Sequence, residues 1–130
     1  MKDHQWRKLL QLSRRILGKG SYVAGASESW CAFTTFSSLT DTCNYWHCGL
    51  PDDDELGETG IADGGIWRQP FLYADLAHII FPATFRWERF DNGQLVHGER
   101  HQPVHALAAE LEGSGIPFRL TKLVLEVKLY

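Results

Sequence analysis

The segment from Thr84 to His97 constrains the fold more than any other part of the chain. Two strand-like runs, Thr84 to Phe90 and Gln94 to His97, flank the tripeptide Asp91-Asn92-Gly93. An Asn-Gly pair readily supplies the two positive φ angles of a type I′ turn, whose twist matches that of paired strands. The sequence therefore predicts a β-hairpin in this segment.

Two helices are predicted, one near the start of the chain and one before its last strand. Apolar residues recur at helical spacing from Asp3 to Leu17, where Asp3 is the expected N-cap and Gly18 ends the helix. The second helix is expected from Pro103 to Leu111, because proline suits the first turn of a helix. Each helix has an apolar side that can pack against a sheet.

Three further segments predict strands. Trp30 to Phe36 is rich in β-branched and aromatic residues, whereas the polar residues Ser37 to Thr42 that follow predict a turn or loop. Tyr73 to Ile80 fits both helical and strand spacing, and we expect a short helix that runs into a strand at Pro82. Apolar and polar residues alternate within Pro117 to Tyr130, which predicts one strand with a fully apolar face.

These elements predict the α+β fold class. Helix, strand, loop, short helix or strand, hairpin, helix and strand follow one another, and this order favours an antiparallel sheet with helices packed on one face. The expected architecture has an N-terminal amphipathic helix and a second helix before the C-terminal strand. A chain of 130 residues can bury one hydrophobic core, so residues 1–130 are expected to form a single domain.

Charge is distributed unevenly along the chain. Six of the 13 basic residues precede Gly20, whereas the stretch from Gly20 to Trp67 contains eight acidic residues and no lysine or arginine. Five glycines lie between Gly49 and Gly65, which predicts a long loop that contains at most a short turn of helix. The chain thus has a basic start, an acidic middle and a balanced end.

The sequence favours a protein of the cytoplasm. Arg14 and Arg15 interrupt the apolar stretch that a secretory signal needs. The longest apolar run, Ala77 to Pro82, is interrupted by His78 and is far shorter than the roughly 20 residues that cross a bilayer. Three cysteines, an odd number, favour reduced thiols over a disulfide framework.

One grouping of cysteines and histidines could bind zinc, which prefers thiolate and imidazole ligands. Cys43, His47 and Cys48 lie in one short segment, and His97 and His101 lie in another. Structural zinc sites usually contain two closely spaced cysteine pairs, whereas this chain has no second pair. A small metal-dependent enzyme, or a thiol enzyme with a histidine-activated cysteine, is therefore an alternative function only, and we expect no cofactor.

The acidic run from Asp52 to Glu55 is expected to be a solvated or partner-binding loop. Its adjacent acidic residues do not match the alternating ligand positions of an EF-hand loop. Basic residues near the start of the chain could contact phosphates, but the acidic middle would repel a nucleic acid. We therefore expect no nucleic-acid partner.

Aromatic residues lie just before the acidic run, and the two together predict an interface with an aromatic centre and a charged surround. The predicted partner-binding residues are Tyr45, Trp46, Asp52, Asp53, Asp54, Glu55 and Glu58.

A small α+β domain with this acidic loop, Pro51 to Glu58, resembles the immunity proteins with which bacteria neutralise polymorphic toxins. The resemblance lies in size, architecture and the loop, because immunity proteins share no common motif. It implies a protein-binding inhibitor, monomeric or homodimeric and independent of membranes, whose acidic surface steers it onto a basic toxin domain. A further alternative is a structural or adaptor subunit that pairs through an exposed sheet edge.

Overall fold

The computed structural model describes all residues, 1–130. Its helices are α1 (Asp3–Leu17), α2 (Phe36–Asp41) and α3 (Val104–Leu111), with short 3₁₀ turns η1 (Ala24–Ala26), η2 (Asp53–Glu55) and η3 (Tyr73–Asp75). Its strands are β1 (Cys31–Thr35), β2 (Trp46–Cys48), β3 (Gly60–Ile61), β4 (Phe71–Leu72), β5 (Leu76–Pro82), β6 (Thr84–Asp91), β7 (Gln94–His101), β8 (Arg119–Leu120) and β9 (Val124–Lys128).

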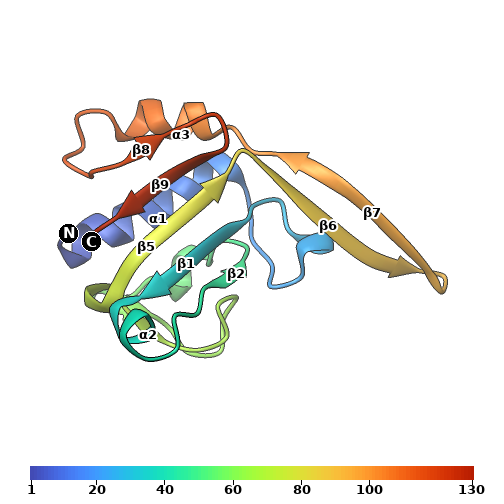
Figure 1. Cartoon of the computed structure of the whole chain (residues 1–130), viewed down its shortest axis with the longest axis horizontal. Coiled ribbons are helices and arrows are strands. Elements are labelled where there is room, and N and C mark those ends of the chain that lie inside the picture. Colours follow the sequence, from blue (N-terminus) through green and yellow to red (C-terminus); the bar gives the residue numbers. More distant parts are fainter.

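Five antiparallel strands form the main sheet, in the order β2-β1-β5-β9-β8. Helix α1 runs behind this sheet in Figure 1, and α3 packs against both α1 and β9. Strands β6 and β7 pair only with each other and project from the sheet as an arm. The predicted fold class is confirmed: an N-terminal helix, an antiparallel sheet, and a second helix before the C-terminal strands. None of the helices is long and apolar enough to cross a bilayer.

The first helix has the predicted bounds, but its N-cap is Lys2 and not Asp3. Asp3 is already helical, where its carboxylate favours the positive end of the helix dipole. The Lys2 amide donates instead to Gln5 Oε1 at 2.8 Å. Gly18 ends the helix with a φ of 114°, a conformation that glycine adopts without steric cost.

One predicted element type was wrong, and one predicted strand is divided in two. Residues 37–42 were expected as a loop, but most of them form α2, because Thr35 Oγ1 accepts a hydrogen bond from the Ser38 amide and caps the helix. The predicted strand within Pro117 to Tyr130 is split into β8 and β9, which pair with each other. Thr121 makes the turn between them, since its hydroxyl accepts from the Val124 amide at 3.1 Å.

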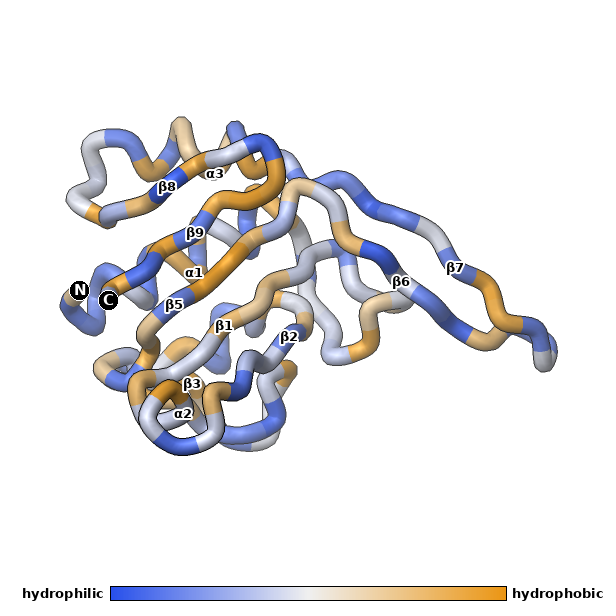
Figure 2. The backbone as a smooth tube through the Cα atoms, viewed as in Figure 1, coloured by the Kyte–Doolittle hydropathy of each residue, from blue (hydrophilic) through white to orange (hydrophobic).

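The predicted hairpin is present, with Asn92 and Gly93 at φ values of 51° and 77°. Figure 2 shows hydrophobic stretches along β5 and β9, whereas the hairpin is mostly hydrophilic. Near its tip Phe90 pairs with Leu95, and Phe90 is 75% exposed. The arm therefore adds little to the core.

One cluster of 23 buried residues forms the core, drawn from α1, β1, β5, α3, β9 and the segment between β2 and β4. Helices α1 and α3 contribute Trp6, Leu9 and Leu107 to it, and β5 and β9 contribute Ile79 and Val127. Residues alternate between the two faces of a strand, so the neighbours of Ile79 and Val127 point to the opposite face of the sheet.

The Gln102 side chain hydrogen-bonds to the main sheet at the base of the arm, where Phe85 of β6 also stacks on Trp30. Gln102 follows β7 directly and is 5% exposed. Gln102 Oε1 accepts from the Trp30 amide at 2.9 Å, and Gln102 Nε2 donates to the Trp30 and Pro82 carbonyls, both at 2.9 Å. The Gln102 amide donates to the Ala83 carbonyl at 2.7 Å. The start of β1, the end of β5 and the base of the arm are thus held at one point.

A polar network lies on the face of the sheet opposite the core. His78 Nε2 lies 2.7 Å from Glu126 Oε2, and Arg119 Nε donates to Glu126 Oε1 at 2.8 Å. On its other side, His78 Nδ1 lies 2.8 Å from the Tyr45 hydroxyl, which lies 3.0 Å from the Tyr130 hydroxyl. The network therefore links β5 to β8, to β9 and to the residues that flank the sheet.

We expect Gln102→Leu to lower the free energy of unfolding by about 3 kcal/mol, because buried backbone groups of Trp30 and Pro82 lose their partners. Urea unfolding followed by tryptophan fluorescence measures the change. Gln94→Leu, at the exposed end of the arm, is the control and should change the stability by no more than about 0.5 kcal/mol. Equal effects of the two substitutions would contradict the role given to Gln102.

The Glu126 carboxylate should make stability sensitive to acid. The hydrogen bond to His78 and the Arg119 guanidinium lower the pKa of Glu126. A lowered folded-state pKa means that the stabilisation is complete above about pH 5 and is lost as the pH falls through that pKa. At pH 6 we expect Glu126→Gln to be less stable than the wild-type protein. At pH 2.5 most of this difference in stability should disappear. Urea unfolding at the two pH values measures both. The control is Glu112→Gln, at an exposed glutamate. A difference of the same size at both pH values would refute this role of Glu126.

Candidate functional site

An aromatic hollow of about 350 Å³ lies where β2 faces the segment that leads to β4. Four separate stretches of the chain line it: Tyr22, Phe33, Tyr45 to Cys48, and Ile66 to Arg68. We call this site the aromatic hollow. Most of its lining is apolar, and Arg68 and His47 supply its cationic and titratable groups.

The floor of the aromatic hollow is a stack of buried rings. Phe33 of β1 stacks on Trp67 with ring centroids 3.7 Å apart and on Trp46 at 5.7 Å, and Phe71 meets Phe33 edge-on at 5.0 Å. Trp67 Nε1 donates to the Gly49 carbonyl at 3.0 Å, so the polar end of this buried ring is satisfied. The floor is therefore well packed and rigid.

The rim of the aromatic hollow is exposed and carries a cation. Tyr22 and Tyr45 are 53% and 40% exposed. The Arg68 guanidinium lies 4.3 Å from the centroid of the Tyr22 ring, within the range of a cation–π contact. Arg68 has a φ of 70°, in the left-handed region that non-glycine residues seldom occupy, and such conformations concentrate at functional sites.

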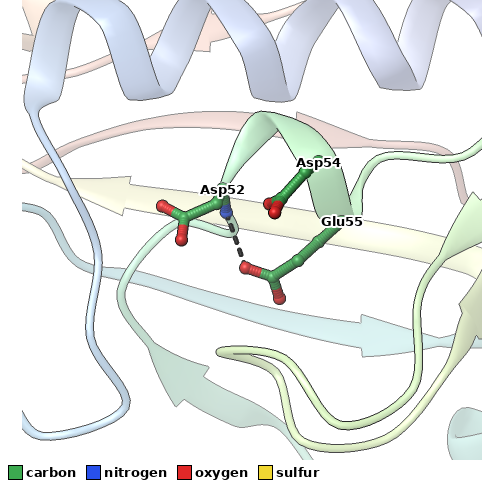
Figure 3. A group of neighbouring side chains, drawn as sticks. All are labelled: Asp52, Asp54 and Glu55. Atoms are coloured by element: carbon green, nitrogen blue, oxygen red, sulfur yellow. Dashed lines mark hydrogen bonds between the residues drawn. The ribbon is translucent and has the colours of Figure 1, made fainter.

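The acidic loop contains the short 3₁₀ turn η2, in agreement with the expectation of at most a short helical turn in this loop. Two of its carboxylates serve the fold (Figure 3). Glu55 Oε2 accepts from the Asp52 amide at 2.8 Å, and Glu55 Oε1 accepts from the Ile66 amide at 2.6 Å. Asp52 forms an ion pair with Arg14 of α1 at 3.2 Å. Asp53, Asp54 and Glu58 are exposed and form no ion pair within the chain.

The acidic loop and the aromatic hollow are neighbours. The Ile66 side chain lines the aromatic hollow while the Ile66 amide binds Glu55, so one residue borders both. Tyr45 and Trp46 lie in the aromatic hollow, whereas Asp54 and Glu55 line a separate depression. The predicted partner-binding residues thus divide into two adjoining parts and do not share one pocket.

The cysteines and histidines proposed as a zinc site are not brought together. Carboxylates of Asp52, Asp54 and Glu55, within 4.8 Å of one another, are the one group of three or more such ligands in the chain. His47 packs near Trp30, with ring centroids 5.8 Å apart. His97 and His101 lie on the arm. The zinc alternative drawn from Cys43, His47, Cys48, His97 and His101 therefore has no geometry to support it.

Two of the three free cysteines are unsuited to nucleophilic chemistry. Burial raises the pKa of Cys48 to about 12 and the pKa of Cys31 well above its usual range, so both thiols are protonated at neutral pH. The third, Cys43, is exposed, and its Sγ contacts the Leu39 carbonyl at 3.2 Å. No histidine hydrogen-bonds to any of the three thiols.

Sequence reasoning missed Tyr22, Trp67 and Arg68. Tyr22 lies in an irregular segment without periodicity, and Trp67 was one of five tryptophans with no mark to set it apart. Arg68 did carry a signal, because it is the first basic residue after the acidic stretch. Tyrosine, tryptophan and arginine are the residues most enriched at the energetic centres of protein interfaces.

No protein-family model, curated protein or solved structure matches this chain. A fold alone does not specify a function, which depends on the residues of the site.

The backbone conformation of Arg68 leads to a stability prediction. We expect Arg68→Gly to be more stable to unfolding than Arg68→Ala by about 1 kcal/mol, because glycine adopts a left-handed conformation without a steric cost. Both variants lack the guanidinium, so the comparison isolates the backbone. Thermal or urea unfolding of the two variants measures the difference. An alanine variant as stable as the glycine variant would show that this conformation carries no cost.

Proposed function

We propose that this protein acts by binding another protein through the aromatic hollow, as an inhibitor of the immunity type. The observation that carries the proposal is the gathering of Tyr22, Tyr45, Trp46 and Arg68, from segments far apart in the sequence, around one exposed hollow. The partner we propose is a basic domain, such as that of a toxin. The unpaired cysteines fit the reducing environment of the cytoplasm, where such an inhibitor would act.

The aromatic hollow has the physical features of an interface centre. Its rim residues are tyrosine and arginine, which are enriched at interface centres, and the tyrosines bury a large area at little cost in side-chain entropy. Its floor, the stack of Phe33 on Trp67, is already packed, so a partner would not have to order it. Its volume of about 350 Å³ is large enough to take more than one side chain of a partner.

The exposed acids next to the aromatic hollow support a basic partner. Asp53, Asp54 and Glu58 form no ion pair within the chain, although Asp53 lies beside basic residues of α1, and all three lie in the loop that adjoins the aromatic hollow through Ile66. Complementary charge raises the association rate and disfavours wrong partners more than it raises affinity. The acids would therefore steer the encounter, and the aromatic hollow would hold the complex.

The main sheet gives the adaptor alternative little support, whereas the eight-residue strands β6 and β7 of the arm each keep one unpaired edge. The edges of the main sheet are β2 and β8, three and two residues long. Short edge strands offer few free backbone groups for pairing with another chain.

The test of the proposed interface begins with capture of the tagged protein from lysate of its source cell, followed by measurement of affinity and of inhibition of the captured partner's activity. We expect Tyr22→Ala and Arg68→Ala each to weaken binding at least about tenfold, the threshold typical of interface centres. Phe90→Ala, at an exposed aromatic residue on the arm, is the matched control and should leave affinity unchanged. Loss of binding in Phe90→Ala, with unchanged binding in Tyr22→Ala and Arg68→Ala, would refute the aromatic hollow as the interface.

Charge reversal tests the role of the acidic loop. We expect the triple variant Asp53→Lys, Asp54→Lys and Glu58→Lys to slow association at least about tenfold at low salt and to have a smaller effect at high salt, because salt screens exposed charges. Stopped-flow association kinetics at two salt concentrations measure the effect. Glu55 is left unchanged because its carboxylate serves the fold. An association rate that is independent of both the substitutions and the salt would show that the acids do not steer the partner.

A further inference from the structure

A second hollow, of about 430 Å³, opens beside β8 and β9. Its lining residues are Pro117, Phe118, Arg119, Glu126, Lys128 and Tyr130. We call it the β8–β9 hollow. None of these residues lines the aromatic hollow, so the proposed interface does not account for it.

Two cations border the β8–β9 hollow with donors to spare. Arg119 is 70% exposed in its side chain and uses Nε and Nη2 on Glu126 Oε1, at 2.8 and 2.7 Å. Three of the five guanidinium N–H groups are then left for a ligand. Lys128 Nζ lies 4.6 Å from the centroid of the Tyr130 ring and takes part in no ion pair. Among the side chains that line the hollow, Glu126 carries the one carboxylate and is paired with Arg119, whereas Lys128 has no acidic partner.

The size and walls of the β8–β9 hollow indicate the kind of anion it would take. A volume of about 430 Å³ falls within the range of small-molecule sites and exceeds the volume of a bare inorganic oxyanion. Pro117 and Phe118 provide an apolar wall next to the two cations. A small organic molecule that carries a carboxylate or phosphate group matches both parts.

A hydrogen-bond chain connects the β8–β9 hollow to His78. When His78 is neutral and Nε2 donates to Glu126, Nδ1 must accept from the Tyr45 hydroxyl, which in turn accepts from Tyr130. When His78 takes up a proton, Nδ1 becomes a donor to the Tyr45 oxygen. Each hydroxyl has one hydrogen, so Tyr45 then donates to Tyr130, and the Tyr130 hydrogen is freed to point into the hollow.

We propose that the β8–β9 hollow binds a small organic oxyanion through Arg119 and Lys128, and that protonation of His78 strengthens this binding by making Tyr130 a donor to the ligand. Burial and the hydrogen bond with Tyr130 raise the pKa of Tyr45 to about 12. Tyr45 therefore stays neutral and transmits the change through the direction of its hydrogen bonds.

The surroundings of His78 leave Glu126 as its one acidic neighbour. Across β5, the residue opposite His78 on β1 is the uncharged Thr34, and the residue opposite on β9 is Lys128. The remaining titratable groups near this chain of hydrogen bonds are Tyr130, Arg119 and the Cys43 thiol, which faces Tyr45.

Calorimetric titration of the full chain with sodium benzoate and with sodium sulfate tests the site, because one probe is a carboxylate with an apolar ring and the other a tetrahedral oxyanion. We expect at least one probe to bind, and Lys128→Gln to weaken it about tenfold. Lys122→Gln, an exposed lysine outside the hollow, should leave the affinity unchanged. Absence of binding by both probes, or equal loss in the two lysine variants, would overturn the site.

Titration of the bound probe at pH 5.5 and at pH 8.0, at constant ionic strength, tests the coupling. We expect the wild-type protein to bind at least about fivefold more tightly at pH 5.5. Tyr45→Phe keeps the ring but breaks the chain, so its affinity should be the same at both pH values; Tyr22→Phe is the control and should behave as wild type. Urea unfolding verifies that each variant is folded. A Tyr45→Phe variant that keeps the full pH dependence would overturn the coupling.

Discussion

The carboxamide of Gln102 lies where the main sheet and the arm meet, and the layout of the molecule depends on it. Strand β5 continues into β6 through Ala83, so the chain leaves the main sheet at the end of β5 and returns to it along β7. That departure would leave backbone groups of Trp30 and Pro82 without partners. Gln102 supplies three hydrogen bonds to them, and buried backbone groups without partners are costly. With this point fixed, β1 and β5 can pair along the rest of their length.

The two faces of the sheet then acquire different chemistry. On one face, α1 and α3 cover the β5–β9 half, and the segment from β2 to β4 covers the β1–β2 half, where Phe33 anchors the ring stack. The opposite face carries His78 and Glu126, which are hydrogen-bonded to each other, to Tyr45 and to Arg119. The two hollows have different lining residues, and Tyr45, which lines the aromatic hollow, connects them through its hydrogen bond with Tyr130.

The candidate site could be predicted from the sequence only in part. Tyr45 and Trp46 were predicted because they are aromatic and lie just before the acidic run, and both line the aromatic hollow. The sequence could not show which acidic residues stabilise the fold and which are free for a partner. No local sequence pattern indicates that Glu55 binds the Ile66 amide or that Asp52 pairs with Arg14. Tyr22 and Arg68 reach the aromatic hollow only because the chain folds back on itself.

The sequence by itself determined the elements that depend on local physics. Helical periodicity fixed α1, the Asn-Gly pair fixed the turn of the arm, and the glycine-rich acidic stretch fixed the loop. Only the tertiary structure decided that the arm leaves the sheet, that β8 and β9 separate, and that His78 meets Glu126. The reason is that periodicity and turn chemistry act between neighbours in the sequence, whereas the partner of a buried polar group is chosen by residues far along the chain.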